Sequence, residues 1–209
     1  MSAPLPASDR AVAGRVPAFT VDAAQRLAGA RQQASPHFDQ RPDAADISLL
    51  VIHSISLPPG QFGAGDGGLS YIDALFLGQL DWRAHPSFES LRELRVSAHL
   101  CIFRDGAVTQ YVPFDRRAWH AGVSAFDGRS RCNDFAIGIE LEGCDEQPFS
   151  DAQYATLGAV TNALRRRYPA ITSARIVGHS DIAPGRKTDP GPHFDWPRLR
   201  AALEQEPGA

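Results

Sequence analysis

Two histidines and an aspartate have the types and positions that a catalytic zinc site would need. His53 and His179 each end a short apolar stretch, and each is followed by a segment rich in proline and glycine. Asp189 lies ten residues after His179, within GHSDIAPGRKTDPGPHFDW. Two imidazoles and one carboxylate form a normal catalytic zinc set and leave a fourth position for water. The spacing is not a compact metal signature, so ordinary structural or exposed roles for these residues stay open.

A carboxylate and an ammonium group could complete such a site. Glu140 lies among small residues in the alternating segment FAIGIELEG, and Lys187 shares the Pro/Gly-rich segment with Asp189. Glu140 could instead be a solvated acid on an open strand face, and Lys187 an ordinary surface lysine. A zinc-held water would serve as the nucleophile, the carboxylate would take its proton, and the ammonium group would stabilise the oxyanion. Together these groups would make an amide hydrolase.

Short strands are expected to present these side chains at their ends. The segment 48–53, SLLVIH, is predicted to be a strand buried on both faces, since four apolar residues precede a Pro-Pro-Gly turn. Residues 135–143 alternate between an apolar face and a face with small residues and two glutamates. Residues 173–177, SARIV, are predicted to form a further short strand. A hairpin is predicted at Arg104-Asp105-Gly106, because glycine supplies the positive φ of the turn.

Helices are expected to flank these strands. The best one begins with a capping box, Ser150 and Gln153, and carries an apolar stripe of Leu157, Val160, Leu164 and Tyr168. Other helices are predicted from Thr20 to Arg31, from Ser70 to Gly78 after the Gly-rich loop 62–70, and from about Asp195 with Pro197 in its first turn.

The fold class predicted from this order is α/β, a single domain with a central mixed sheet flanked by α-helices and the zinc site at one edge of the sheet. Residues 1–34 are expected to be an N-terminal extension, partly disordered apart from the short helix, and residues 35–209 the main domain.

Composition restricts the class of function. The 209 residues are 22% charged with a net charge of -3, so no basic excess suggests a nucleic-acid partner. No apolar run approaches a membrane span, and the N-terminus lacks the apolar core of a signal peptide. Three cysteines without CxxC spacing favour free thiols in a reducing compartment. A soluble cytoplasmic protein, acting as a monomer and without a membrane partner, is therefore expected.

Six blocks of the chain resemble a known family. LLVIHSISLPPG, YIDALFLG, LRVSAHLCIFRDG, QYVPFDRRAWHAG, RCNDFAIGIELEG and GHSDIAPGRKTDPGPHFDW are similar, in order and spacing, to the cytoplasmic AmpD-type N-acetylmuramoyl-L-alanine amidases. Their superfamily also contains T7-type lysozyme and the peptidoglycan recognition proteins. The resemblance runs from about Ser35 to Leu203 and implies that residues 35–209 form an amidase domain.

The resemblance implies a role for each candidate residue. The family's zinc ligands fall on His53, His179 and Asp189, its catalytic carboxylate on Glu140 and its oxyanion-stabilising lysine on Lys187. One zinc ion per chain is thus expected. The prolines and glycines of the last block would hold two ligands and the lysine in a fixed geometry. His99 and His120 are then expected to shape the sheet and the cleft instead of binding metal.

The substrate implied by the resemblance is a soluble muropeptide. It is 1,6-anhydro-N-acetylmuramic acid carrying L-Ala-D-Glu-diaminopimelate, cut between the lactyl group and L-Ala during peptidoglycan recycling. Arg95 and Arg131 match positions that would grip the acidic peptide, and Trp119 would wall the cleft. Both arginines could alternatively form surface ion pairs.

Two departures and two rival functions stand beside this interpretation. Ser54 follows the first ligand where close relatives commonly have Asn, and the loop 62–70 is longer than usual by about five residues, a change that costs little in a loop.

One rival is a non-catalytic peptidoglycan-binding module, against which the complete ligand set counts. The other is an exported amidase that acts on intact peptidoglycan, against which the missing signal peptide counts.

Overall fold

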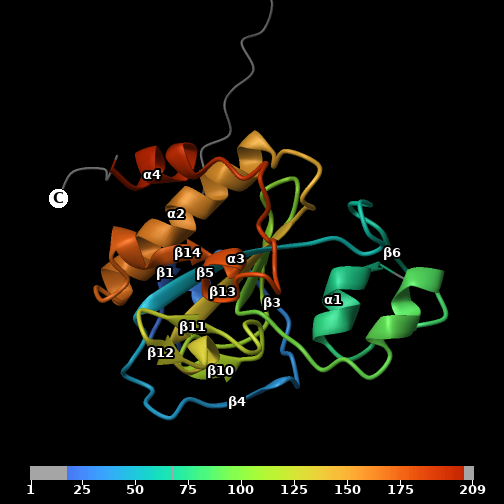
Figure 1. Ribbon diagram of the computed structural model, residues 1–209, viewed down its shortest axis with the longest axis horizontal. Helices are drawn as coiled ribbons and strands as arrows, with labels where there is room; N and C mark the ends of the chain where they lie inside the picture. Colours follow the sequence, from blue (N-terminus) through green and yellow to red (C-terminus); the bar gives the residue numbers. More distant parts are fainter. Residues whose placement is uncertain (1–17, 67, 205–209) are drawn as a thin grey trace, which may run out of the picture.

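A six-stranded mixed sheet forms the centre of the molecule (Figure 1). The computed structural model describes residues 18–66 and 68–204. The strand order is β14 (Ile176–Gly178), β5 (Leu49–Ile55), β13 (Ala136–Glu142), β8 (Leu100–Ile102), β9 (Val108–Gln110) and β3 (Arg31–Gln32). All neighbours are parallel except β8 and β9, which form the expected hairpin. The predicted mixed sheet is confirmed.

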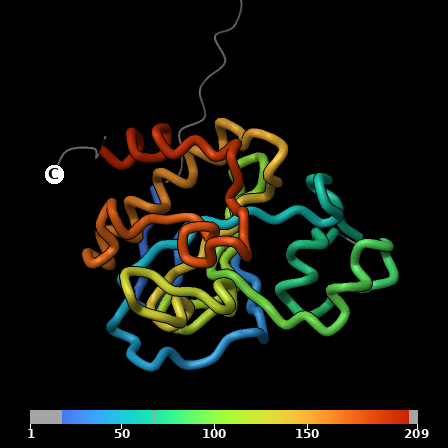
Figure 2. The backbone as a smooth tube through the Cα atoms, in the orientation of Figure 1, coloured from blue at the N-terminus to red at the C-terminus, as the bar shows by residue number. Residues whose placement is uncertain are grey.

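The strand register brings residues distant in sequence to one edge of the sheet. In the parallel ladders, His53 of β5 is paired with Glu140 of β13, and Gly178 of β14 is paired with Ile52. His179 therefore follows β14 directly beside the end of β5. Figure 2 shows the same proximity, since the orange-red segment after β14 passes beside the cyan β5.

Helix α2 (Asp151–Arg167) covers one face of the sheet together with α4 (Trp196–Glu204). The predicted capping box at Ser150 and Gln153 is present, and Gln153 also donates to the carbonyls of Ile102 and Glu142 at the strand ends. The core between helices and sheet contains the predicted stripe Leu157, Val160, Leu164 and Tyr168, packed with the apolar residues of β5, β8 and β13. Burial of these side chains is the main stabilisation of the fold.

The other face of the sheet carries a smaller lobe, on the right of Figure 1. It contains α1 (Tyr71–Phe76), capped as predicted by Ser70, and the 3₁₀ helix η1 (Pro86–Leu91). A second apolar cluster joins α1 and η1 to this face through residues such as Leu75, Phe88 and Cys101. The loop before α1 contains two short paired strands, β6 (Gly65–Asp66) and β7 (Leu69–Ser70).

The remaining elements are short. Strand β4 (Phe38–Gln40) pairs with β10 (Arg116–Ala118), and β11 (Ala125–Phe126) pairs with β12 (Arg129–Ser130). Single turns of helix occur at η2 (Cys132–Asp134), η3 (Ser173–Arg175) and α3 (His179–Ile182). Within the described ranges, no helix is long and apolar enough to cross a membrane.

The helix predicted from Thr20 to Arg31 does not form. Strands β1 (Thr20–Val21) and β2 (Leu27–Ala28) pair in antiparallel fashion there, and β3 follows at the sheet edge. Gln25 and Gly29 have positive φ, which a right-handed helix excludes, and Leu27 is buried in the main core. Long-range burial thus outweighed the local pattern. The disorder expected near the N-terminus falls, for residues 1–17, outside the described residues, and the division of the chain at residue 34 stays a prediction.

Candidate metal centre and active site

The structure brings His53, His179 and Asp189 together at the carboxyl ends of β5 and β14. The His53 Nδ1 and His179 Nδ1 atoms are 3.0 Å apart. Asp189 Oδ2 lies 3.1 Å from His53 Nδ1 and 3.0 Å from His179 Nδ1. Both histidines are almost fully buried, and the three candidate ligand atoms lie within 4.8 Å of one another.

The Pro/Gly-rich segment fixes the third ligand against the second. The Ser180 N–H donates to the Asp189 carbonyl at 3.0 Å, which joins the beginning of α3 to the end of the loop. A Cβ atom at Gly178 would lie 2.8 Å from Pro190 Cδ, so only glycine permits this close approach. The Gly191 N–H donates to the Thr188 carbonyl and closes the turn after Asp189. The loop therefore needs no helix or strand to hold its geometry.

The donor chemistry of the three residues fits a zinc ion. His179 Nε2 lies 3.2 Å from the carbonyl oxygen of Ala121, which can only accept, so Nε2 carries the proton and Nδ1 presents a lone pair. Burial lowers the pKa of His53 to about 4, so this imidazole is neutral at pH 7. Burial would raise the pKa of Asp189, but the adjacent His179 and His53 rings outweigh burial and hold this pKa below its usual value. The lone pairs of the two imidazoles and the carboxylate therefore converge on one point, where a bound cation would stabilise them.

Glu140 and Lys187 line the same cavity as the three candidate ligands. Glu140 is 9% exposed, and its Oε2 atom has no hydrogen-bond partner in the part of the chain that is described. Burial and then the Asp189 carboxylate raise the pKa of Glu140 well above its usual value, whereas Lys187 lowers it. A carboxyl group whose pKa is raised by burial is suited to accept and return a proton.

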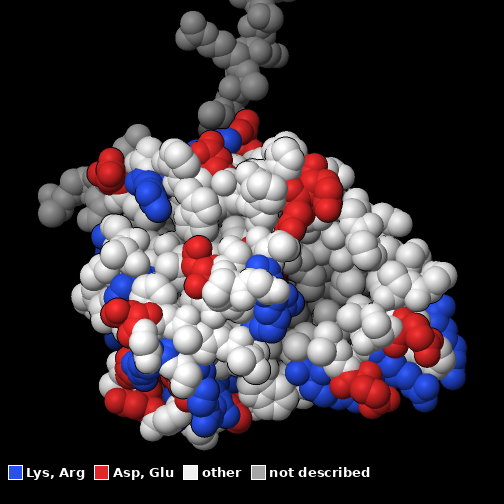
Figure 3. Space-filling model, viewed as in Figure 1, with Lys and Arg blue, Asp and Glu red and all other residues white. Residues whose placement is uncertain are grey.

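The cavity is a cleft of about 500 Å³ between the candidate ligand residues and the α1 lobe. The space-filling view shows the surface hollowed between the parts that carry α3 and α1 (Figure 3). Trp119 and Arg95 are among the residues that line the cleft. Its apolar wall is formed by Leu57, Leu75, Phe76, Leu91 and Leu94.

Arg131 is not among the residues that line this cleft. Its side chain is 69% exposed and pairs with Asp134 at 3.2 Å, while its backbone has a left-handed φ of 63°. Arg186 and Asn133 line the cleft instead, although the sequence analysis gave them no role. The position of Arg186 beside Lys187 was a usable signal, whereas nothing in the sequence marked Asn133.

His120 occupies the space that the small residues of β13 leave free. A Cβ atom at Gly138 would lie 2.5 Å from the His120 ring. His120 Nδ1 is 2.9 Å from His53 Nε2, and the His99 ring lies edge-on to the His120 ring. His99 accepts the Gly138 N–H through Nδ1 and is therefore protonated at Nε2, which donates to the Arg116 carbonyl. The His120 ring lines the cleft, whereas the fully buried His99 ring packs against it.

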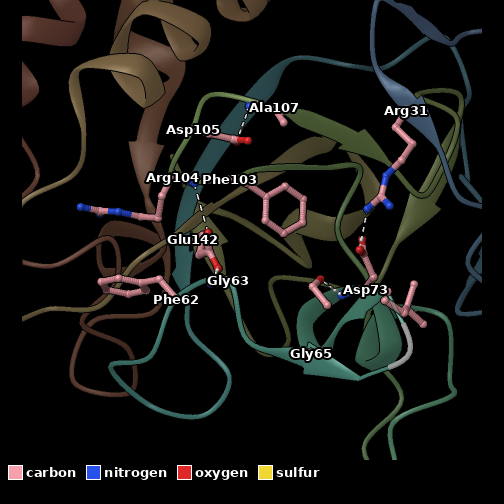
Figure 4. A pocket seen from close by; sticks show the side chains of 13 residues that line it. Arg31, Phe62, Gly63, Gly65, Asp73, Phe103, Arg104, Asp105, Ala107 and Glu142 are labelled. Carbon is pink, nitrogen blue, oxygen red and sulfur yellow. Dashed lines mark hydrogen bonds and ion pairs between the residues drawn. The ribbon is translucent and has the colours of Figure 1, made fainter.

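A second cavity, of about 640 Å³, is lined by residues of the loop before α1, of α1 itself and of β13 (Figure 4). Glu142 forms part of its wall and accepts the N–H groups of Gly63 at 2.6 Å and Arg104 at 3.1 Å. On the opposite wall, Asp73 is paired with Arg31 and accepts the Tyr111 hydroxyl. The carboxylates of this cavity are thus used to tie the loop 62–70 and α1 to the sheet.

Comparison with known proteins gives a consistent assignment. The family model described as N-acetylmuramoyl-L-alanine amidase matches residues 43–192. The 1,6-anhydro-N-acetylmuramyl-L-alanine amidase AmpD of Citrobacter freundii is 62% identical over 177 residues, which are 85% of this chain and 91% of the relative. A crystal structure of a selenomethionine derivative of AmpD is 60% identical, with a TM-score of 0.81 over 86% of this chain and 97% of that chain.

A more distant structure includes a bound substrate. The amidase AmiD of E. coli, in complex with anhydro-N-acetylmuramic acid-L-Ala-D-γ-Glu-L-Lys, is 28% identical with a TM-score of 0.55. The alignment covers 88% of this chain and 65% of that chain.

Proposed function

Because the chain belongs to the N-acetylmuramoyl-L-alanine amidase family, we propose that it is a zinc-dependent amidase of peptidoglycan recycling. It hydrolyses the amide between the lactyl group of 1,6-anhydro-N-acetylmuramic acid and L-alanine in soluble muropeptides of the cytoplasm. The observation that carries the proposal is the convergence of His53, His179 and Asp189 beside Glu140 and Lys187 in one cleft. High identity to AmpD over most of both chains supports the anhydro sugar as the substrate.

Zinc bound by His53, His179 and Asp189 would supply Lewis-acid polarisation of the scissile carbonyl and a lowered pKa for a water molecule. Glu140 takes a proton from the attacking water and returns it to the amide nitrogen as the peptide leaves. Its pairing with His53 in the strand register supports this role, because directly paired residues of neighbouring strands present their side chains on the same face of the sheet. Its Oε2 atom, which has no hydrogen-bond partner among the described residues, is available for that proton.

Lys187 stabilises the oxyanion that develops on the scissile carbonyl. Lys187 lies between His179 and Asp189 in the sequence, and its backbone N–H donates to the Ala183 carbonyl at 3.1 Å. Because Lys187 lines the cleft together with Glu140, its ammonium group can reach a carbonyl oxygen bound there.

The remaining lining residues suit an amphiphilic muropeptide. Trp119 and the leucines of the α1 side provide an apolar surface for the compact anhydro sugar. Arg95 lies at the same wall and can pair with a peptide carboxylate. Arg131, outside the lining residues, would act on the far end of the peptide.

A side-by-side assay on three substrates tests the proposal. Equal amounts of zinc-loaded enzyme are incubated with 1,6-anhydromuramyl tripeptide, the reducing-end muramyl tripeptide and insoluble sacculi, and the products are identified by mass. Much faster release of free tripeptide from the anhydro substrate is expected. Equal or faster release from sacculi would instead indicate an amidase that acts on intact peptidoglycan.

A further inference from the structure

We propose that His120 is a positioning residue that fixes the tautomer and orientation of His53, and that residues 120–121 brace both histidine ligands together. The inference rests on the proposed zinc site and concerns how this chain prepares it. Imidazole ligands generally donate their other ring N–H to a fixed acceptor, which orients the ring.

The geometry at His53 leaves one arrangement of protons that permits metal binding. His53 Nδ1 points to His179 and Asp189, so this atom must present its lone pair to a metal. The ring proton must then lie on His53 Nε2, where His120 Nδ1 is the hydrogen-bond partner at 2.9 Å. His120 is therefore the acceptor, and its own proton is on Nε2.

The His120 ring is held in place from several sides. Gly138 lies directly beneath it, where any Cβ atom would collide with the ring. The backbone N–H groups of His120 and Ala121 both donate to Asn133 Oδ1, at 3.2 and 2.8 Å. The two hydrogen bonds fix the backbone that carries the ring, and the packing against Gly138 fixes one face of the ring itself.

The second histidine ligand is braced by the next residue. The carbonyl of Ala121 accepts the His179 Nε2–H at 3.2 Å and also accepts from Arg186 at 2.7 Å. The acceptors for the two ligands thus lie on adjacent residues, and one amide oxygen, that of Asn133, holds the backbone of both. A shift of this segment would disturb both ligands at once.

A purely space-filling role does not explain the imidazole. His120 Nε2 is buried and has no hydrogen-bond partner among residues 18–66 and 68–204. A buried donor without a partner is costly. An apolar side chain of similar size would avoid that cost, but it would offer His53 no acceptor.

Two variants separate the acceptor from the packing. His120→Asn keeps an oxygen at the position of Nδ1, three bonds from Cα, whereas His120→Leu fills similar space with a methyl group. Zinc affinity is measured by competition with a chelator at pH 7. His120→Leu should bind zinc about 10–100-fold more weakly, and His120→Asn should stay within about threefold of the wild type. The exposed His193, changed to Leu, is the control for loss of a histidine and should leave zinc affinity unchanged.

Nitrogen NMR of the zinc-loaded wild type provides a second readout. A scalar coupling between His53 Nε2 and His120 Nδ1, with the proton on His53, is expected across the hydrogen bond. A proton on His120 Nδ1, or equal zinc affinities for the Leu and Asn variants, would overturn the inference. If His120→Leu does not fold, the Asn variant and the wild-type spectrum still decide. A wild type that binds zinc with these properties yet cleaves no muropeptide would refute the proposed function alone.

Discussion

Glu140 and Glu142 lie on the same face of β13, two residues apart, yet the structure gives them different surroundings. Glu142 is 3% exposed and its two oxygens accept two backbone N–H groups, whereas Glu140 lines the cleft with one oxygen unpartnered. A change of each residue to glutamine should therefore damage different properties of the protein.

Glu142→Gln is expected to reduce stability. Glutamine retains one oxygen, so either Gly63 or Arg104 would meet an amide NH₂ group in place of an acceptor. Loss of one such buried, charge-assisted bond costs about 1–3 kcal/mol of unfolding free energy. For a chain of this length that loss lowers Tm by roughly 2–12 °C. Turnover by the folded variant should change only a few-fold, by about threefold at most, because Glu142 lies outside the cleft.

Glu140→Gln is expected to reduce turnover. Glutamine cannot accept the water proton, and kcat should fall by at least ~10²-fold, or about 2.7 kcal/mol in the barrier. Stability should be unchanged or higher, since burial disfavours the charged form of Glu140, as its raised pKa shows. Zinc should remain bound because Glu140 is not one of the three converging ligand residues.

The assay combines steady-state kinetics on 1,6-anhydromuramyl tripeptide with thermal unfolding and zinc content for both variants and the wild type. The expected pattern is an inactive, stable Glu140→Gln and an active, destabilised Glu142→Gln. Similar losses of turnover in the two variants, or a larger loss for Glu142→Gln, would show that the catalytic carboxylate has been assigned to the wrong residue.

Three other changes have definite expected outcomes. Lys187→Met should lower kcat by about 10²–10³-fold while zinc stays bound, and loss of zinc from this variant would show that Lys187 supports the ligands instead of an oxyanion. Arg95→Ala and Arg131→Ala should each raise KM by about tenfold or more with kcat nearly unchanged, and an unaltered KM would remove that arginine from the substrate contacts. In the zinc-free protein, burial holds the pKa of His53 at about 4, below its unfolded value, so its contribution to stability is present above about pH 6.5 and is lost as the pH falls towards 4. The free energy of unfolding in urea should fall between pH 7 and pH 5 by about 2 kcal/mol more for the wild type than for His53→Asn. An equal fall for the two proteins would contradict the neutral, buried state of His53.

The parts of the fold that the sequence predicted best are those with local signals. The capping box and apolar stripe of α2 lie within one helix, and the apolar run before His53 is sufficient for a buried strand. The helix predicted from Thr20 to Arg31 was wrong because the structure of this segment depends on residues far away in the sequence. One of them is Gln110, whose side chain accepts the Leu27 N–H. Local periodicity does not contain that information.

The same distinction applies to the site. His179, Lys187 and Asp189 lie close together in the sequence, within one Pro/Gly-rich block, and all three line one cleft. The contact of His53 with His120 joins residues 67 positions apart, so no spacing reveals it. Arg131 was expected to face the substrate, but its left-handed backbone and its ion pair with Asp134 depend on the turn after β12.

Zinc titration of the activity tests the central claim most directly. The metal-free protein is prepared with a chelator, zinc is added in substoichiometric steps, and release of the tripeptide from 1,6-anhydromuramyl tripeptide is measured after each step. If His53, His179 and Asp189 form the catalytic metal site, the rate should rise in proportion to zinc and reach a plateau at about one ion per chain. Full activity without metal, or a plateau that does not depend on these three residues, would contradict the account.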